Sequence, residues 1–365
     1  MNDKIKNIVV TIVLSVFFIS FSLACFIRTP DEISSSERRK LAQLPAFTLS
    51  GILNGKDIED FEDYTLDQFP LRDSFRSLKA FFLFNVMQQL DNNDIYIVGD
   101  SVSKLEYPLN ESNIKYATDK FQYLYETYLK DQNPNVFYTI VPDKNYFLAE
   151  ENGYPSLDYK KLVSLVKSGM SNMTYIDIFD CLTIDDYYRT DLHWRQEKLG
   201  TVAQRLANAM NKTLSATYET KQYSPFYGVY CGQSALTIEP DTLYYLTNDI
   251  LENAKVFNHE KNTYEKIYTT EKLTGMDSYD VYLSGATPLL TIMNDNATTD
   301  KRLVIFRDSF GSSITPLLVE AYSQITVVDI RYVPSKMLGE YIDLVADDVL
   351  FLYSTSVLNN SRSLR

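Results

Sequence analysis

The stretch Leu303-Val304-Ile305-Phe306-Arg307-Asp308-Ser309-Phe310-Gly311 decides which fold this chain is expected to adopt. Its first four residues are branched or aromatic, which is typical of a short buried strand. The apolar residues 310–322 that follow have the length and pattern of a helix. Residues 307–309 form the polar turn between the two. The sequence therefore predicts a strand that passes directly into a helix, as in sheets covered by helices.

The same alternation of short apolar strands and helices continues on both sides of this stretch. Further strands are predicted over 136–141, 174–178, 325–328 and 349–353. Helices are predicted over 58–67, 74–90, 112–130, 158–168, 194–210 and 334–345. Residues 215–290 are rich in Tyr, Thr and turn residues, and we expect them to form an inserted β-rich lobe. The expected fold is α/β, with a mostly parallel sheet and helices on both faces.

The N-terminal residues predict a membrane-spanning helix. Residues 8–27 carry no charge, and a helix of this length matches the hydrocarbon thickness of a bilayer. The stretch is longer than the apolar region of most signal peptides and lacks an A-x-A cleavage site. Residues 22–25 faintly resemble a lipoprotein cleavage box, which is the alternative. We expect residues 1–28 to be a cytoplasmic tip and an uncleaved transmembrane signal anchor, and residues 29–56 a stalk.

Composition argues against two classes of partner. The chain has a formal net charge of −13, whereas nucleic-acid binding requires clustered Lys and Arg, so no nucleic acid is expected. Two histidines and two cysteines outside the membrane segment do not make a standard zinc site, and no Gly-rich phosphate loop is present. We therefore expect no metal and no cofactor.

Cys181 and Cys231 either pair or stay free, and their spacing leaves both possibilities open.

The motif Thr190-Asp191-Leu192-His193-Trp194 combines residue types used in acid–base chemistry. The other histidine, His259, lies in a polar run that is typical of a solvated loop. Asp191 precedes His193 by two residues, so in an extended segment both side chains point to the same side. Asp191 can then orient the imidazole and stabilise its protonated form, as in a Ser-His-Asp triad. The alternative is a buried neutral imidazole that serves only in packing.

Position selects the nucleophile among many serines. Doubly wound sheets place their sites at the carboxyl ends of strands, and Ser309 lies in the turn between the predicted strand and helix. A helix N-terminus supplies free N–H groups and a positive field, which can hold an oxyanion, and Gly311 relieves crowding nearby. Serine is also a common N-cap residue, so position alone leaves both roles open.

Five short motifs follow one another along the chain: Phe69-Pro70-Leu71-Arg72-Asp73, Val141-Pro142-Asp143-Lys144, residues 187–194 with Gly200, Asp308-Ser309-Phe310 and Asp329-Ile330-Arg331-Tyr332. Together they resemble the bacterial DHHW family, which is similar to the alginate O-acetyltransferase proteins and to SGNH-like esterases and acyltransferases. The matches run from about residue 57 to the C-terminus. Leu192 replaces the first His of the name-giving motif, and the SGNH oxyanion blocks are not identifiable.

The resemblance implies a flavodoxin-like, SGNH-type catalytic domain over residues 57–365, with the insertion at 215–290. It implies Ser309 as nucleophile, His193 as base and Asp191 as orienting carboxylate. Further candidates for substrate binding or oxyanion support are Lys144, Arg307, Arg331, Tyr332 and Trp194. For the charged residues among them, the alternative role is a surface charge or a structural ion pair, and for Trp194 it is packing in the core.

The resemblance also implies an activity and a location. The expected protein is a membrane-anchored O-acyltransferase, in its simplest form an O-acetyltransferase, with its catalytic domain outside the cytoplasm. It is expected to act on an exported or cell-surface polysaccharide through an acyl-serine intermediate, with a multi-span membrane acyltransferase as the acyl donor. The alternatives are a carbohydrate acetylesterase with the same triad and a non-catalytic polysaccharide-binding or assembly protein.

Overall fold

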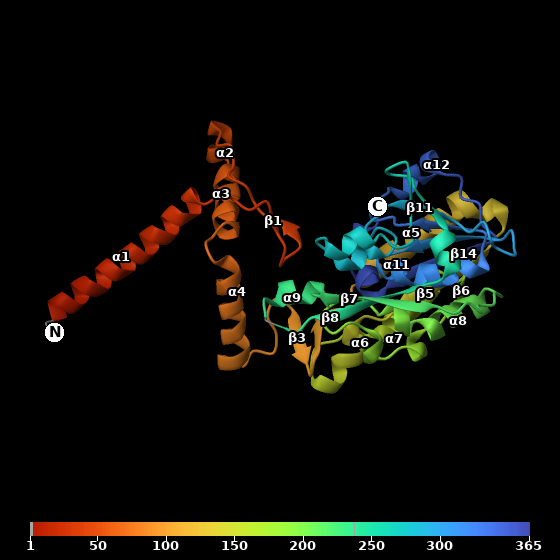
Figure 1. Ribbon diagram of the computed structural model, residues 1–365, viewed down its shortest axis with the longest axis horizontal. Coiled ribbons are helices and arrows are strands. Elements are labelled where there is room, and N and C mark those ends of the chain that lie inside the picture. The colour runs from red at the N-terminus through yellow and green to blue at the C-terminus, as the bar shows by residue number, and fades with distance from the viewer. Residues whose placement is uncertain (1–2, 237) are drawn as a thin grey trace. The chain divides into compact units, whose positions relative to one another are not determined.

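The computed structural model describes residues 3–236 and 238–365, which divide into two compact units (Figure 1). One unit consists of Met1–Asn93 with Cys231–Ile238, and the other of Asp94–Tyr230 with Glu239–Arg365. The predicted stalk and catalytic-domain boundaries remain predictions, because a compact unit need not coincide with a functional domain.

The first unit contains the predicted membrane segment as the uninterrupted helix α1 (Asp3–Ile27). Over Asp3–Cys25 this helix is long and apolar enough to cross a membrane, a length and composition that a signal sequence shares. The remaining elements of the unit are β1 (Ile33–Ser34), β2 (Arg39–Lys40), α2 (Leu49–Leu53), α3 (Lys56–Asp67) and α4 (Arg72–Phe81), with a π-helical turn over Phe82–Val86.

The second unit is built on an eight-stranded sheet with the strand order β10-β9-β11-β13-β12-β14-β5-β6. Parallel pairing joins β13 (Gln324–Val328), β12 (Arg302–Arg307), β14 (Asp348–Ser354), β5 (Asn135–Val141) and β6 (Thr174–Tyr175). Counted from β12, these strands have the order 2-1-3-4-5 of a flavodoxin-like sheet. The last two strands of that order precede the first three in the chain.

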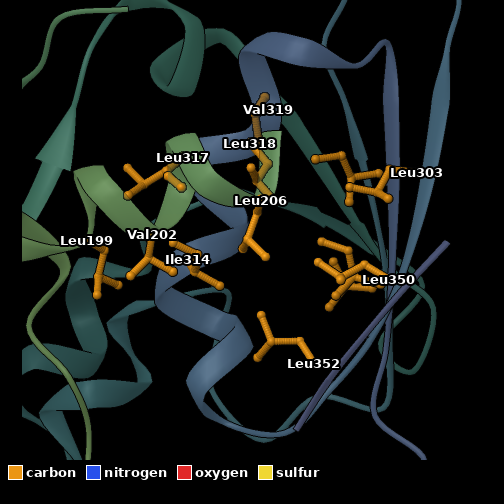
Figure 2. Close-up of a cluster of buried hydrophobic side chains, with 14 of the residues drawn as sticks. Leu199, Val202, Leu206, Leu303, Ile314, Leu317, Leu318, Val319, Leu350 and Leu352 are labelled. Carbon is orange, nitrogen blue, oxygen red and sulfur yellow. The ribbon is translucent and has the colours of Figure 1, made fainter. Parts of the chain in front are cut away.

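Helices cover both faces of this sheet, as the alternation predicted. Leu303 and Ile305 of β12 enter one core, together with side chains of α8 (Gly200–Ala209), α11 (Phe310–Ile314) and the 3-10 segment after it. Figure 2 shows part of this core. Val304 and Phe306 enter the opposite core, against α5 (Glu111–Leu124) and α7 (Tyr159–Gly169). Each fully buried Leu, Ile, Val or Phe contributes about 1.5–3 kcal/mol to folding.

Residues 215–290 differ from the expected lobe, because their strands divide between two sheets. β7 (Glu219–Phe226) and β8 (Asp241–Thr247) pair with each other as a separate ribbon. In contrast, β9 (Lys255–Asn258), β10 (Thr263–Glu265) and β11 (Leu289–Met293) extend the central sheet in antiparallel orientation. The first four residues of β11 are buried, and such a strand needs cover on both faces, which only the central sheet provides.

The helix predicted over 310–322 is α-helical only as far as Ile314. Residues 315–321 continue as a 3-10 helix, with Pro316 near its start. Proline has no N–H to donate to the preceding turn, so the α-helical hydrogen-bond pattern is interrupted there. Shorter elements of the chain are β3 (Ile95–Val98), β4 (Ser101–Lys104), α6 (Lys144–Leu148), α9 (Val229–Ser234), α10 (Asp249–Asn253), α12 (Leu338–Tyr341) and α13 (Thr355–Asn359).

Candidate active site

Asp191, His193 and Ser309 form a chain of hydrogen bonds at the carboxyl end of the parallel strands. His193 Nε2 lies 2.8 Å from Ser309 Oγ, and His193 Nδ1 lies 2.6 Å from Asp191 Oδ1. Asp191 and His193 are buried, whereas Ser309 is partly exposed, so the hydroxyl is the group that a substrate can reach. In this arrangement the imidazole can take the serine proton while the carboxylate stabilises the resulting positive charge.

The turn after β12 positions Ser309. The carboxylate of the preceding residue, Asp308, accepts hydrogen bonds from the N–H of Phe310 (3.0 Å) and of Ser354 (2.7 Å), which fixes the turn to the end of β14. A Cβ atom at Gly311 would lie 2.4 Å from Arg307 Cβ, so only glycine lets α11 begin this close to the strand.

Ser309 does not use its side chain as an N-cap. Its hydroxyl lies against His193 instead, as described above. The N–H of Phe310 is bonded to Asp308 Oδ1, and the N–H of Gly311 to the Asp308 carbonyl oxygen (3.1 Å). These two donors at the helix N-terminus, which the sequence suggested for an oxyanion, are therefore already used within the turn.

The Asp-His segment is a bend and not the extended stretch that the sequence predicted. Asp191 Oδ1 accepts the backbone N–H of His193 (3.0 Å) while it also contacts the ring nitrogen, so the two side chains meet by closing a turn. Asp191 Oδ2 accepts the backbone N–H of Val229 (2.8 Å). Two backbone donors therefore hold the carboxylate in the orientation that faces the imidazole.

Residues that the sequence analysis did not identify hold this bend from the other side. Asp241 accepts hydrogen bonds from the Thr190 N–H (2.8 Å) and hydroxyl (2.6 Å). The N–H of Gly228 donates to Thr190 Oγ1 (2.9 Å), and a Cβ atom at Gly228 would lie 2.2 Å from the Thr190 carbonyl oxygen. Both residues come from the predicted insertion, where composition indicated strands but could not indicate this contact.

Trp194 ties the Asp-His segment to α11. It is fully buried, and its Nε1 donates to Ser313 Oγ (2.8 Å) and to the Phe310 carbonyl oxygen (3.2 Å). The indole therefore holds the bend against α11, the helix that begins directly after Ser309. It has no exposed surface for a ligand, which agrees with the core role weighed as its alternative.

Lys144 lies beneath the bend and does not face solvent. Its Nζ donates to the carbonyl oxygens of Tyr188 and Arg189 (both 2.8 Å), of Asp191 (3.3 Å) and of Val102. Because these carbonyl groups come from the residues that lead into the Asp-His motif and from β4, the ammonium group cross-links the two segments. The lysine was a candidate for substrate binding, but the structure gives it a structural place.

Replacing Lys144 with methionine is expected to lower the free energy of unfolding by about 2–4 kcal/mol, because buried carbonyl groups lose their donor. Ester turnover is expected to fall as well, since the bend carries Asp191 and His193. Thermal unfolding of the detergent-solubilised chain measures the first effect. The control is Lys160→Met on the exposed side of α7, which is expected to change stability by less than about 0.5 kcal/mol. If the two substitutions lowered the free energy of unfolding equally, the structural role assigned to Lys144 would be contradicted.

Arg307 and Arg331 are committed to one carboxylate. Arg307 is fully buried and lies 3.2 Å from Asp329, and burial lowers the pKa of its guanidinium. Arg331 donates to both oxygens of Asp329, at 2.9 and 2.7 Å. The sequence proposed both arginines for binding or oxyanion support, and the structure gives them the ion-pair role that was their alternative. Neither makes a hydrogen bond to the Asp191–His193–Ser309 chain within the residues that the structure describes.

Tyr332 and His259 line a different hollow. Tyr332 is exposed, and with His259 it borders a cavity of about 320 Å³. Asp191, His193 and Ser309 are not among the residues that line this cavity. His259 was expected in a solvated loop, but it is partly buried, its Nε2 lies 2.9 Å from Thr291 Oγ1, and burial lowers its pKa. The expected loop residue is thus packed against β11.

Tyr279 is the contact to His193 that sequence analysis missed. The two rings are stacked with centroids 3.8 Å apart and planes 7° apart. The Tyr279 hydroxyl donates to Ser313 Oγ (2.8 Å), and burial raises the pKa of Tyr279 well above its usual value, so the hydroxyl stays protonated. The tyrosine therefore fixes the plane of the imidazole while Asp191 fixes its rotation. With 28 tyrosines in the chain, no sequence signal distinguishes this one.

Replacing Tyr279 with leucine is expected to lower kcat about 3- to 10-fold, which corresponds to the loss of one aromatic contact. KM is expected to stay nearly constant, because the ring orients His193 and lies behind it. Tyr279→Phe keeps the stacked ring and loses only the hydroxyl, so it is the matched control and should retain most of kcat. Steady-state kinetics on an activated acetyl ester measure both variants, and an equal loss in the two would contradict the stacking role.

The described residues contain no group of three or more His, Cys, Asp or Glu side chains that could hold a metal ion. Among the described residues, Cys25, Cys181 and Cys231 form no disulfide bond. The sequence left a disulfide bond between Cys181 and Cys231 open, and the structure does not contain it.

Comparison with known proteins gives a family match over part of the chain and several similar folds. Residues 153–328 match the family described as DHHW protein, and this range contains all three residues of the hydrogen-bonded chain. A DHHW family protein from Eubacterium siraeum is 20% identical, with a TM-score of 0.61, and the alignment covers 75% of this chain and 95% of that one. No curated protein matches the chain.

Bacillus cereus PatB1 gives a similar result. Its structure is 20% identical with a TM-score of 0.59, over 72% of this chain and 96% of PatB1. A second PatB1 structure, with a sulfonyl adduct, is 20% identical with a TM-score of 0.58, over 72% of this chain and 97% of that one. At this identity the likeness shows that the folds are similar.

Proposed function

We propose that this chain, whose residues 153–328 match the DHHW family, is a serine-dependent O-acyltransferase that acts on a polysaccharide. The observation that carries the proposal is the 2.8 Å contact between His193 Nε2 and the partly exposed Ser309 Oγ. A serine hydroxyl is a weak nucleophile until a neighbouring base takes its proton, and His193 is in position to do so.

The proposed reaction has two halves. In the first, Ser309 Oγ attacks the acyl carbonyl carbon while its proton moves to His193 Nε2. The tetrahedral intermediate collapses, the bond to the leaving oxygen breaks, and that oxygen takes the proton from His193. In the second, a sugar hydroxyl gives its proton to His193 and attacks the acyl-serine. Collapse releases the sugar ester, and Ser309 recovers its proton. Asp191 stabilises the imidazolium in both halves.

The proposed location follows from α1. A helix that can cross a membrane over Asp3–Cys25 would tether the chain to the bilayer. The proposed side, outside the cytoplasm, is the one that the resemblance to the DHHW family implies. Exported polysaccharides pass this surface, whereas activated acyl thioesters are made in the cytoplasm. The chain would therefore receive its acyl group from a multi-span membrane acyltransferase. An acetyl group is the simplest acyl group that it could transfer.

The test uses the full chain in detergent. A sulfonyl fluoride, a reagent class suggested by the adduct on PatB1, is expected to modify one serine, and mass spectrometry should place the modification on Ser309. His193→Ala is the control and should remove the labelling, because the hydroxyl then lacks its base. If no serine is labelled, or if the His193→Ala variant is labelled as well as the unmodified chain, the result would favour the non-catalytic alternative.

A second measurement separates transfer from hydrolysis. The labelling-competent chain is given an activated acetyl ester and an unacetylated oligosaccharide, and the acetylated sugar and free acetate are quantified. Acetyl transfer that rises with sugar concentration at the expense of acetate supports the transferase. Acetate alone across a panel of bacterial oligosaccharides would indicate a carbohydrate acetylesterase with the same site.

A further inference from the structure

The helix α4 exposes a continuous apolar stripe. Its members lie on α4 and its π-helical continuation, spaced three, four and four residues apart, which places them on one face, and each is 40–60% exposed: Phe75, Leu78, Phe82 and Val86. A helix of a globular protein normally turns such a face toward the core. Exposed apolar surface of this extent is typical of a site that contacts another apolar phase.

The opposite face of α4 carries its polar contacts with the rest of the first unit. Ala80 is fully buried there. Arg76 lies 3.3 Å from Glu37 and donates to the Gly232 carbonyl oxygen at 2.8 Å, and Arg72 also pairs with Glu37. The helix is therefore held to its unit through polar groups, and its apolar stripe faces away from these contacts.

The stripe begins beside the membrane-spanning helix. The ring of Phe21, within the Asp3–Cys25 span of α1, stacks on Phe69 with centroids 5.4 Å apart and meets Phe75 edge-on at 6.0 Å. Phe21 precedes the end of α1 by six residues, which is about 9 Å at 1.5 Å per residue. If α1 spans the bilayer, Phe75 and the start of the stripe lie near the boundary between acyl chains and head groups.

We propose that α4 with its π-helical continuation, residues 72–86, lies in the interface of the bilayer that α1 crosses, with the stripe toward the acyl chains. The proposal rests on the anchoring by α1 put forward above. Amphipathic helices with one apolar face bind in this way, and aromatic side chains favour this depth. Because the contact is apolar, it does not require anionic lipid, which suits a chain of net charge −13.

The test places an environment-sensitive nitrobenzoxadiazole label at single cysteines of the full chain, after its three cysteines are replaced by alanine. The positions are Leu78→Cys on the stripe, Asp73→Cys on the exposed opposite face, and Val13→Cys in α1. The chain is reconstituted in phosphatidylcholine vesicles at high lipid excess. A doxyl-labelled lipid then reports contact with acyl chains, and iodide reports contact with water.

We expect the lipid quencher to act at Leu78→Cys at least threefold more strongly than at Asp73→Cys, and iodide to show the reverse order. Equal access of iodide to both positions would overturn the proposal, while lipid contact at Val13→Cys would leave the anchor intact. Protection of Leu78→Cys from both quenchers would overturn it in favour of a protein on the stripe. Iodide access at Val13→Cys would overturn the anchor and the proposal together.

Discussion

Replacing Ser309 with alanine is expected to lower turnover of an activated acetyl ester by at least about 10³-fold. The substitution removes the atom that attacks the acyl carbon. A water molecule in the place of the hydroxyl cannot form the acyl-serine intermediate. The side chain is partly exposed and its contact is the one to His193, so stability should change by less than about 1 kcal/mol. Steady-state kinetics and thermal unfolding of the same preparation measure the two effects.

Ser312→Ala is the matched control, because it removes a hydroxyl from the next turn of the same helix. Ser312 is buried and is not part of the Asp191–His193–Ser309 chain, so its loss should leave turnover within about threefold of the unmodified chain. Undiminished turnover in Ser309→Ala, or an equal loss in both variants, would refute Ser309 as the nucleophile.

Replacing Asp191 with asparagine is expected to lower kcat by about 10²- to 10⁴-fold with little change in KM. The amide has nearly the shape of the carboxylate, and its oxygen can still accept one of the backbone N–H groups of His193 and Val229. It carries no charge, however, and therefore cannot stabilise the imidazolium that forms when His193 takes the serine proton. The loss should thus appear in the chemical step and leave ester binding intact.

Asp241→Asn separates this charge effect from a disturbance of the bend. Asp241 also holds the bend, through the Thr190 N–H and hydroxyl, but it does not touch the imidazole. Its neutralisation is expected to lower kcat by less than about 10-fold. If Asp241→Asn lowers kcat as much as Asp191→Asn does, the carboxylate of Asp191 acts by shaping the bend, and its proposed electrostatic role is wrong.

Short-range patterns in the sequence predicted much of this protein. Branched residues followed by a polar turn and an apolar run predicted β12, the turn and the start of α11. A long uncharged run predicted α1. The resemblance to the DHHW family is confirmed by the match over residues 153–328. The first two of these signals each lie within one element or one turn, where propensity and periodicity act directly on the backbone.

The surroundings of Asp191, His193 and Ser309 could not be predicted in the same way. Lys144, Arg307 and Trp194 were candidates for substrate contact because of their chemical type, yet each is buried and bonded to residues far away in the chain. Whether a charged side chain meets solvent, a carboxylate or a ring of carbonyl groups depends on packing between distant segments. A short window of sequence carries no such information.

The sequence by itself determined the apolar helix at the N-terminus, the strand-to-helix turn that carries Ser309 and the pairing of an aspartate with a histidine two residues later. The tertiary structure alone decided that Trp194 holds that pair against the turn, that Lys144 joins it to β4, and that Tyr279 lies flat on the imidazole. The physical reason is range. Hydrogen-bond patterns and apolar periodicity are written into neighbouring residues, whereas a 2.8 Å contact between residues 193 and 309 exists only after the sheet has formed.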